Sequence, residues 1–217
     1  MSELRSLTEL IDISPLLRIG MGVFPGDAVF AVRQTFTVGP DCPVNVASFS
    51  MSTHCGAHVD APLHYDSEGA SIDKLDLGDF IGPARVIDAR GQDALCGFDA
   101  IASALDGAPP RVLLKLMDRG DQLAWPTGFR ALAPETVERL ALAGIRLIGV
   151  DVPSVDPETS KDLPSHMVCR RHDIRIVENL VLADVAPGDY ELIALPLKLE
   201  GLDAAPVRAV LRRSAPR

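Results

Sequence analysis

The sequence has no apolar segment long enough to cross a bilayer and no cluster of basic residues. Its longest nearly apolar stretch, residues 141–150, is interrupted by Arg146, and it is far shorter than the ~20 residues that a membrane-spanning helix needs. Acidic residues number 30 against 21 basic ones, which gives a formal net charge of -9. These absences predict a protein that binds neither membranes nor the nucleic-acid backbone.

Cysteine is also scarce, and its spacing suits neither a disulfide framework nor a thiolate zinc site. The four cysteines are Cys42, Cys55, Cys96 and Cys169, and no two of them form a CxxC pair. The N-terminal segment carries two glutamates and lacks the apolar core of a signal peptide. We therefore expect reduced thiols and a cytoplasmic location.

The sequence does contain an alternation of short apolar runs and helical patterns. Its 217 residues show no internal repeat and no low-complexity linker, so we expect a single domain over residues 1–217. Residues 134–144 predict a helix, because proline stands at the start and glycine follows the end. A second helix is predicted over residues 160–171 despite Pro164. Together these patterns predict an α/β fold with a mixed β-sheet core flanked by helices. The predicted strands are residues 28–38, 84–88, 111–116, 145–150, 174–178, 190–197 and 207–211.

Histidine is scarce as well, yet it is concentrated in one segment. Of five histidines, three fall within residues 54–64, which read HCGAHVDAPLH. A straight strand, at ~3.3 Å per residue, would hold His54 and His58 too far apart to share a metal ion. A continuous helix would turn Asp60 about 200° away from His58. The segment therefore predicts a curl at Gly56, followed by an extended stretch in which His58 and Asp60 share a face.

The residue types of this segment suit a divalent metal ion. Two imidazoles and a carboxylate favour zinc, with manganese or iron as substitutes. His64, four residues beyond Asp60, is either a further ligand or a proton-transfer group. His166, toward the end of a predicted helix, and Glu178, at the end of a predicted strand, are candidates to complete the site. His172 is the nearest rival to His166. The alternative is a set of unrelated histidines without a shared partner.

A series of motifs extends over nearly the whole chain. They are residues 12–15 (DISP), 24–27 (FPGD), 39–46 (GPDCPVNV), 54–65, 149–157 (GVDVPSVDP), 160–161, 176–178 and 190–197. In this order they resemble the bacterial kynurenine formamidases (arylformamidases), a family of cyclase-like metal-dependent hydrolases. The number of separate matches makes the resemblance specific.

The resemblance implies a fold, a cofactor and roles for individual residues. It implies the swivelling β/β/α cyclase-like fold, two divalent metal ions per chain, usually zinc, and a homodimer. His64 corresponds to the residue that accepts and donates the proton, and Phe24 corresponds to a substrate-lining aromatic residue that is typically tryptophan. In the family, both carboxylate ligands lie between the two ions. The positions that correspond to the metal ligands are His54, His58, Asp60, His166 and Glu178.

Two positions depart from the family pattern. Cys55 stands where the family usually has threonine, and it is either a small packing residue or a thiol that tunes the choice of metal and makes the site sensitive to oxidation. Phe24 keeps an aromatic face but lacks the indole N–H of tryptophan. This second departure could shift the preference among aromatic substrates.

The implied activity is the hydrolysis of N-formyl-L-kynurenine to L-kynurenine and formate, in tryptophan degradation by the kynurenine pathway. A hydroxide held by the two ions would attack the formyl carbon, and His64 would transfer the proton. One alternative is another ring-opening hydrolase of the same superfamily, such as one acting on isatin, for which Phe24, Tyr65 and Trp125 are the discriminating aromatic residues. The other is a metal-stabilised binding module without turnover, although structural zinc sites commonly use four ligands that include cysteine.

Overall fold

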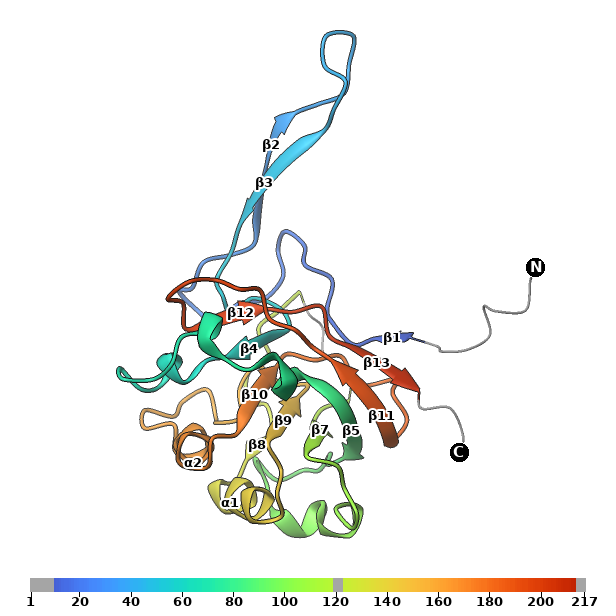
Figure 1. Ribbon diagram of the computed structural model, residues 1–217. Helices are drawn as coiled ribbons and strands as arrows, with labels where there is room; N and C mark the ends of the chain where they lie inside the picture. The colour runs from blue at the N-terminus through green and yellow to red at the C-terminus, as the bar shows by residue number, and fades with distance from the viewer. Residues whose placement is uncertain (1–9, 119–122, 214–217) are drawn as a thin grey trace, which may run out of the picture.

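The centre of the molecule is a nine-stranded mixed sheet (Figure 1). The structure is a computed structural model that describes residues 10–118 and 123–213. Across the sheet the strands follow the order β1-β13-β11-β5-β7-β9-β10-β4-β12. They are β1 (Leu10–Asp12), β4 (His58–Asp60), β5 (Ile81–Asp88), β7 (Arg111–Lys115), β9 (Leu147–Val150), β10 (Arg175–Glu178), β11 (Gly188–Ile193), β12 (Ala204–Pro206) and β13 (Val210–Arg213).

The middle of this sheet is parallel and its two sides are antiparallel. Strands β5, β7, β9 and β10 run parallel to one another, whereas β11 joins β5 and β4 joins β10 in the antiparallel sense. Parallel strands are normally covered on both faces, which explains their continuous apolar runs. The described residues also form short 3-10 helices and two small two-stranded sheets. These are η1 (Pro62–His64), η2 (Ile72–Lys74), η3 (Leu77–Phe80), η4 (Phe98–Ala100), η5 (Ala102–Ala104), the pair β2 (Ala31–Phe36) and β3 (Val46–Ser50), and the pair β6 (Leu95–Cys96) and β8 (Ala131–Leu132).

Each face of the central sheet buries its own hydrophobic core. On one face, Val112 and Leu114 of β7 belong to the cluster that includes Leu140 of α1 (Pro134–Leu142). Leu113, whose side chain points the opposite way, belongs to the other cluster. Figure 1 shows α1 and α2 (Pro164–His172) side by side against the first face. This confirms the predicted α/β architecture.

Helix α1 forms where the sequence predicts it, but α2 begins four residues later than predicted. Pro164 stands at the start of α2 instead of inside it, because proline lacks the N–H that an interior position needs. Leu163, just before it, has a left-handed backbone with φ 45°. The predicted helix over residues 160–171 is therefore wrong in its first turn.

The predicted strand over residues 207–211 begins three residues too early, because the chain changes partners there. Strand β12 pairs with β4 and ends at Pro206, whereas β13 starts at Val210 and pairs with β11. Between them the N–H of Val207 donates to the carbonyl of Ala57. The predicted strand over residues 190–197 likewise ends early, at Ile193.

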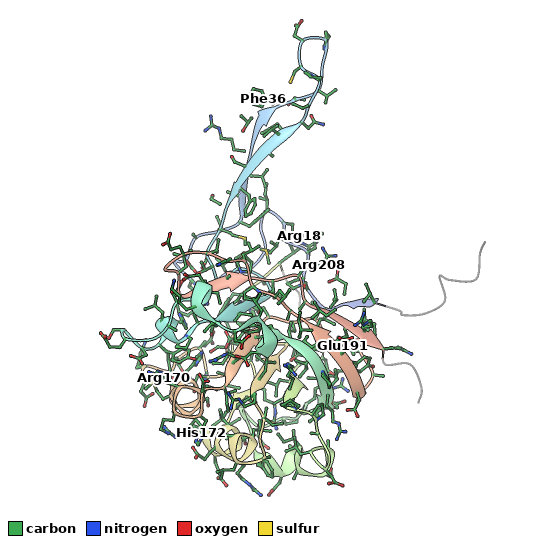
Figure 2. The ribbon with its side chains drawn as sticks, in the orientation of Figure 1. Arg18, Phe36, Arg170, His172, Glu191 and Arg208 are labelled. Carbon is green, nitrogen blue, oxygen red and sulfur yellow. The ribbon has the colours of Figure 1, made fainter. Side chains whose placement is uncertain are left out.

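A hairpin arm, made of β2 and β3, extends away from the body of the molecule (Figure 1). Every residue of its two strands is exposed. Figure 2 shows Phe36 on this arm, far from the central sheet. None of the helices in the described part of the chain has the length and apolar character needed to span a membrane.

Candidate metal centre

The histidine segment adopts the curl and the extended stretch that its spacing predicts. Gly56 has φ +72°, and a side chain there would come within 2.5 Å of Leu17 Cδ2, so glycine suits both the turn and the packing. The curl brings the rings of His54 and His58 to 4.8 Å between centroids. Strand β4 then aligns His58 with Asp60, whose Oδ1 lies 3.1 Å from His54 Nδ1.

Strand pairing brings Glu178 to this segment. In the antiparallel register of β4 and β10, Glu178 lies directly opposite His58, and Ile176 lies opposite Asp60. Opposite residues of an antiparallel pair project from the same face. Glu178 Oε2 accordingly lies 3.5 Å from His58 Nε2, and its Oε1 accepts a hydrogen bond of 2.8 Å from the N–H of Val155. Glu178 is therefore fixed beside the histidines.

His166 joins the same cluster from the first turn of α2. Its Nε2 lies 3.4 Å from Asp60 Oδ2 and 3.7 Å from Glu178 Oε1. The Asp156 carboxylate accepts the backbone N–H groups of Ser165 and His166, each at 2.9 Å, and lies 2.7 Å from His166 Nδ1. The sequence prediction placed His166 toward the end of its helix. That part of the prediction is wrong, because the helix starts later than predicted and His166 lies in its first turn.

Each of these imidazoles uses one nitrogen for an outer partner and points the other at the carboxylates. His58 Nδ1 lies 2.9 Å from the carbonyl of Gly56 and donates to it, which leaves Nε2 facing inward. His54 Nε2 lies 3.1 Å from Asp203 Oδ2, which leaves Nδ1 facing Asp60. Outer partners of this kind fix ring orientation and tautomer at metal sites.

The cluster contains buried polar atoms without a hydrogen-bond partner. Among the described residues these include His58 Nε2 and Asp60 Oδ1, which lie 3.4 Å apart. Buried polar atoms normally have partners. Two groups of ligand atoms share Asp60, and within each group all atoms lie within 4.8 Å of one another. The first group is His54, Asp60 and His64, and the second is His58, Asp60 and Glu178. This donor chemistry and these unpartnered atoms fit a divalent cation.

The ionisable groups of the cluster shift one another's pKa values. Burial alone would raise the pKa of Asp60, but the three surrounding histidines lower that pKa well below its usual 3.8. Burial alone would lower the pKa of His58, but the close carboxylates of Asp60 and Glu178 raise it to about 10. The site therefore favours the ionised form of Asp60, and positive charge beside it is favourable.

His64 lies at the outer edge of this cluster, as the last residue of η1. Its ring centroid is 4.2 Å from that of His54, and its Nδ1 is 3.5 Å from Asp203 Oδ2. Its side chain is 32% exposed, in contrast to the buried His58 and His166. Burial lowers the pKa of His64. Its position gives it access both to solvent and to the cluster.

Asp203 and Asp156 are site residues that the sequence interpretation missed. Asp203 comes just before β12, and its backbone carbonyl accepts the N–H of Ala61. Its Oδ1 accepts a 3.1 Å hydrogen bond from Thr53, and its Oδ2 contacts the two partly exposed histidines, His54 and His64. Asp203 is 149 residues away from His54 in sequence, and no local pattern indicates that it belongs to the site. Asp156 lies within the noted motif of residues 149–157, which was the available signal.

Two other predicted candidates lie outside the cluster. His172, the rival to His166, lies on α2 (Figure 2). Its Nε2 is 2.7 Å from Glu138 Oε1 of α1, and this contact places it outside the cluster. Cys55 is buried, and its sulfur lies 3.6 Å from that of Met21. Burial raises the pKa of this thiol. These contacts support a packing role for Cys55.

The three aromatic candidates separate into two places. Tyr65 lies against the cluster, with its ring centroid 5.1 Å from that of His166. Phe24 instead packs edge-to-face on Trp125, with 5.5 Å between centroids. The described contacts do not join this pair to the histidines. Of the three candidates, Tyr65 is therefore the one that contacts the histidines of the site.

The fold is shared with proteins of a known class. The Cyclase family model, described as "Putative cyclase", matches residues 11–157. A solved structure described as a potential metal-dependent hydrolase with cyclase activity matches with a TM-score of 0.82 and 29% identity, covering 96% of this chain and 100% of the other. An isatin hydrolase bound to a product analogue has the same fold, with a TM-score of 0.82 at 21% identity and coverage of 98% and 95%. The class is that of cyclase-like, metal-dependent hydrolases.

Curated relatives narrow this class. The kynurenine formamidase of Delftia acidovorans is 53% identical over 206 residues, which span 95% of this chain and 98% of the relative. The kynurenine formamidase of Bordetella pertussis is 49% identical over 209 residues, which span 96% and 100%. The chain therefore belongs to the cyclase family and, within it, to the kynurenine formamidases, as its motifs indicated.

Proposed function

We propose that this protein hydrolyses N-formyl-L-kynurenine to L-kynurenine and formate at a divalent-metal site centred on Asp60. The observation that carries the proposal is a pair of buried ligand atoms that have no hydrogen bond, Asp60 Oδ1 and His58 Nε2. They occur in a chain that is about half identical to kynurenine formamidases over nearly its whole length.

The proposed cofactor is a pair of divalent ions, with zinc favoured and manganese as a substitute. The two oxygens of Asp60 face different imidazoles, since Oδ1 lies near His54 and His58 whereas Oδ2 lies near His166. This division supports a carboxylate that is shared by two ions. The residues proposed to hold the ions are His54, His58, Asp60, His166 and Glu178.

The proposed reaction breaks the bond between the formyl carbon and the arylamine nitrogen. The bound cations would supply Lewis acidity toward the formyl oxygen and toward water. His64 accepts a proton as water adds to the formyl carbon and delivers a proton to the departing nitrogen, because an unprotonated arylamine leaves poorly. Asp203 orients His64 through its Nδ1, and Phe24 remains the proposed substrate-lining aromatic residue.

An assay with metal analysis tests this function. We expect formamide hydrolysis that is lost on chelation with EDTA and restored by zinc or manganese. Isatin is the comparison substrate. Faster turnover of isatin than of the formamide would show that the protein is a ring-opening hydrolase instead. One tightly held ion without turnover of either substrate would instead favour a structural metal site.

Asp203 provides the first prediction, as a positioning residue. The Asp203 carboxylate contacts both His54 and His64. Asp203→Asn should therefore lower kcat about 10- to 100-fold. It should also change the pH dependence of kcat, whereas KM should change little. Asp203→Glu should restore part of the rate. Asp99→Asn, at a fully exposed side chain, is the control, and equal rates for the Asp203→Asn and Asp99→Asn variants would contradict the role.

For the assembly, the proposed state is a homodimer, and the hairpin arm supports it. Val32 and Phe49 face each other on one side of the arm, with the Phe30 ring 6.0 Å from that of Phe49. Arg33 and Ser48 pair on the other side. Val32 is 48% exposed and Phe49 is 63% exposed. A two-stranded hairpin is marginal alone, and a second chain would cover its apolar side.

The second prediction concerns this arm. We expect wild-type protein to sediment as a dimer and Phe49→Ser to weaken dimerisation about 10-fold or more, because an aromatic contact that buries the ring is lost. Arg33→Ser, on the opposite side of the arm, is the matched control and should leave the dimer intact. Analytical ultracentrifugation over a concentration series makes the measurement. A wild-type monomer at micromolar concentration would overturn both the dimer and the role of the arm.

A further inference from the structure

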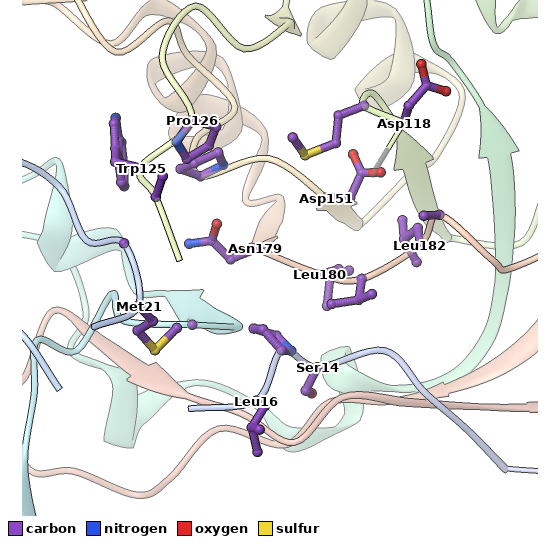
Figure 3. A pocket seen from close by; sticks show the side chains of 18 of the residues that line it. Ser14, Leu16, Met21, Asp118, Trp125, Pro126, Asp151, Asn179, Leu180 and Leu182 are labelled. Atoms are coloured by element: carbon purple, nitrogen blue, oxygen red, sulfur yellow. The ribbon is translucent and has the colours of Figure 1, made fainter. Parts of the chain in front are cut away.

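A pocket of about 610 Å³ lies outside the metal centre, at the carboxyl ends of the central parallel strands (Figure 3). Asp118 follows β7, Asp151 follows β9 and Asn179 follows β10, and all three line the pocket. The remaining lining residues include Ser14, Leu16, Arg18 and Met21 from the N-terminal segment, and Trp125 with its neighbours Ala124 and Pro126. Ligands of open α/β sheets bind at such strand ends.

Asp151 gives this pocket a buried group that needs a partner. Asp151 is buried, with 6% of the residue exposed. One oxygen, Oδ1, accepts a 2.7 Å hydrogen bond from the N–H of Leu116, whereas Oδ2 has no partner among the described residues. Burial raises the pKa of Asp151 to about 7. A buried oxygen without a hydrogen bond is costly, and a polar ligand group in the pocket would remove that cost.

Asn179 separates this pocket from the metal centre. Its backbone is left-handed, with φ 57°, a conformation that asparagine tolerates better than most residues. Its N–H donates to the carbonyl of Val152, while the preceding Glu178 accepts from Val155. Figure 3 shows the Asn179 amide inside the pocket. None of the five proposed metal ligands lines this pocket, although Gly56 of the histidine segment does, so the pocket is adjacent to the metal centre and shares no ligand with it.

The lining favours a cation on an apolar body. The Trp125 indole is held by a 3.0 Å hydrogen bond from Nε1 to Glu158 Oε2, and aromatic faces attract ammonium groups. Among the described lining residues, the carboxylates of Asp118, Asp151 and Asp184 outnumber the one basic side chain, that of Arg18. Apolar contact comes from the remaining side chains, which include Met21, Leu180 and Leu182.

We propose that this pocket is a second small-molecule site, which binds a primary ammonium carried on an aromatic or aliphatic body. The ammonium would donate to the free oxygen of Asp151, and the apolar body would lie between Trp125 and Leu180. The proposal does not rest on formamide hydrolysis, because the pocket's recognition groups are not the proposed metal ligands. Trp125 does contact Phe24, the proposed substrate-lining residue, so the test must separate the amine from the substrate.

Titration calorimetry on metal-loaded protein tests the site, with 2-phenylethylamine as the probe. We expect the amine to bind. We expect 2-phenylethanol, which has the same body without the charge, to bind at least about 10-fold more weakly than the amine. Asp151→Asn keeps an oxygen that accepts the N–H of Leu116, and it should weaken binding of the amine by a similar factor. Asp99→Asn, at a fully exposed side chain outside the pocket, is the acid-to-amide control and should leave the affinity unchanged.

A second variant protects the test against misfolding of the first. Asn179→Gly keeps the left-handed backbone and removes only the amide, so it should weaken the amine without loss of folding. Equal affinity of the amine for wild type and for Asp151→Asn would overturn the proposal, as would equal affinity of the amine and the alcohol. Competition between the amine and N-formyl-L-kynurenine would overturn it too, by placing the amine at the metal centre.

Discussion

Replacing Asp60 by asparagine is expected to remove both the bound metal and the hydrolytic activity. Asp60 is 1% exposed, and its two oxygens lie 3.1 to 3.4 Å from the nitrogens of three histidines. An amide cannot supply the negative charge or the second anionic oxygen. The loss of activity should exceed ~100-fold, the upper end for removal of a mere outer partner of a metal ligand.

Elemental analysis and the formamide assay measure this outcome together. Circular dichroism would show whether the variant is folded, since a buried carboxylate with three histidine contacts also contributes to packing. Asp99→Asn provides an acid-to-amide control at an exposed position and should retain metal and rate. An Asp60→Asn protein that keeps its full metal content and activity would remove Asp60 from the centre of the site.

Replacing His64 by alanine is expected to lower turnover about 10²- to 10⁴-fold, the usual contribution of a proton-transfer group, while the metal content persists. The physical reason is its position. Its side chain is partly exposed at the edge of the cluster, whereas His58 and His166 are buried against the carboxylates. Loss of His64 therefore removes a proton carrier and leaves the inner ligand set intact.

The measurement separates the two roles that the sequence leaves open for His64. Loss of activity with retained metal supports proton transfer, whereas loss of one ion per chain identifies His64 as a ligand. His172→Ala is the matched control, because His172 is bonded to Glu138 between the helices. That variant should keep wild-type turnover. Full activity in His64→Ala would contradict both roles.

Local geometry explains why part of the site could be predicted. The curl at Gly56 and the shared face of His58 and Asp60 follow from backbone geometry over a few residues, and strand β4 confirms both. The same holds for α1, whose proline start and glycine end are local signals. Neither prediction needed a distant contact.

Long-range packing explains what the local patterns missed. The start of α2 depends on Asp156, whose carboxylate accepts two N–H groups of its first turn. The break between β12 and β13 depends on which strand each one joins, namely β4 or β11. Neither choice is encoded in hydrophobic periodicity. Propensity alone therefore placed His166 at the wrong end of its helix.

The sequence by itself determined the residue types of the site, the local turn that assembles three of them, and the family. Only the tertiary structure decided how the second half of the site is completed. The register of β10 against β4 brings Glu178 beside His58, and β12 brings Asp203, 149 residues from His54, to the outer histidines. The reason is physical, because neighbouring dihedral angles fix a turn, whereas contacts between distant segments depend on how the whole sheet packs.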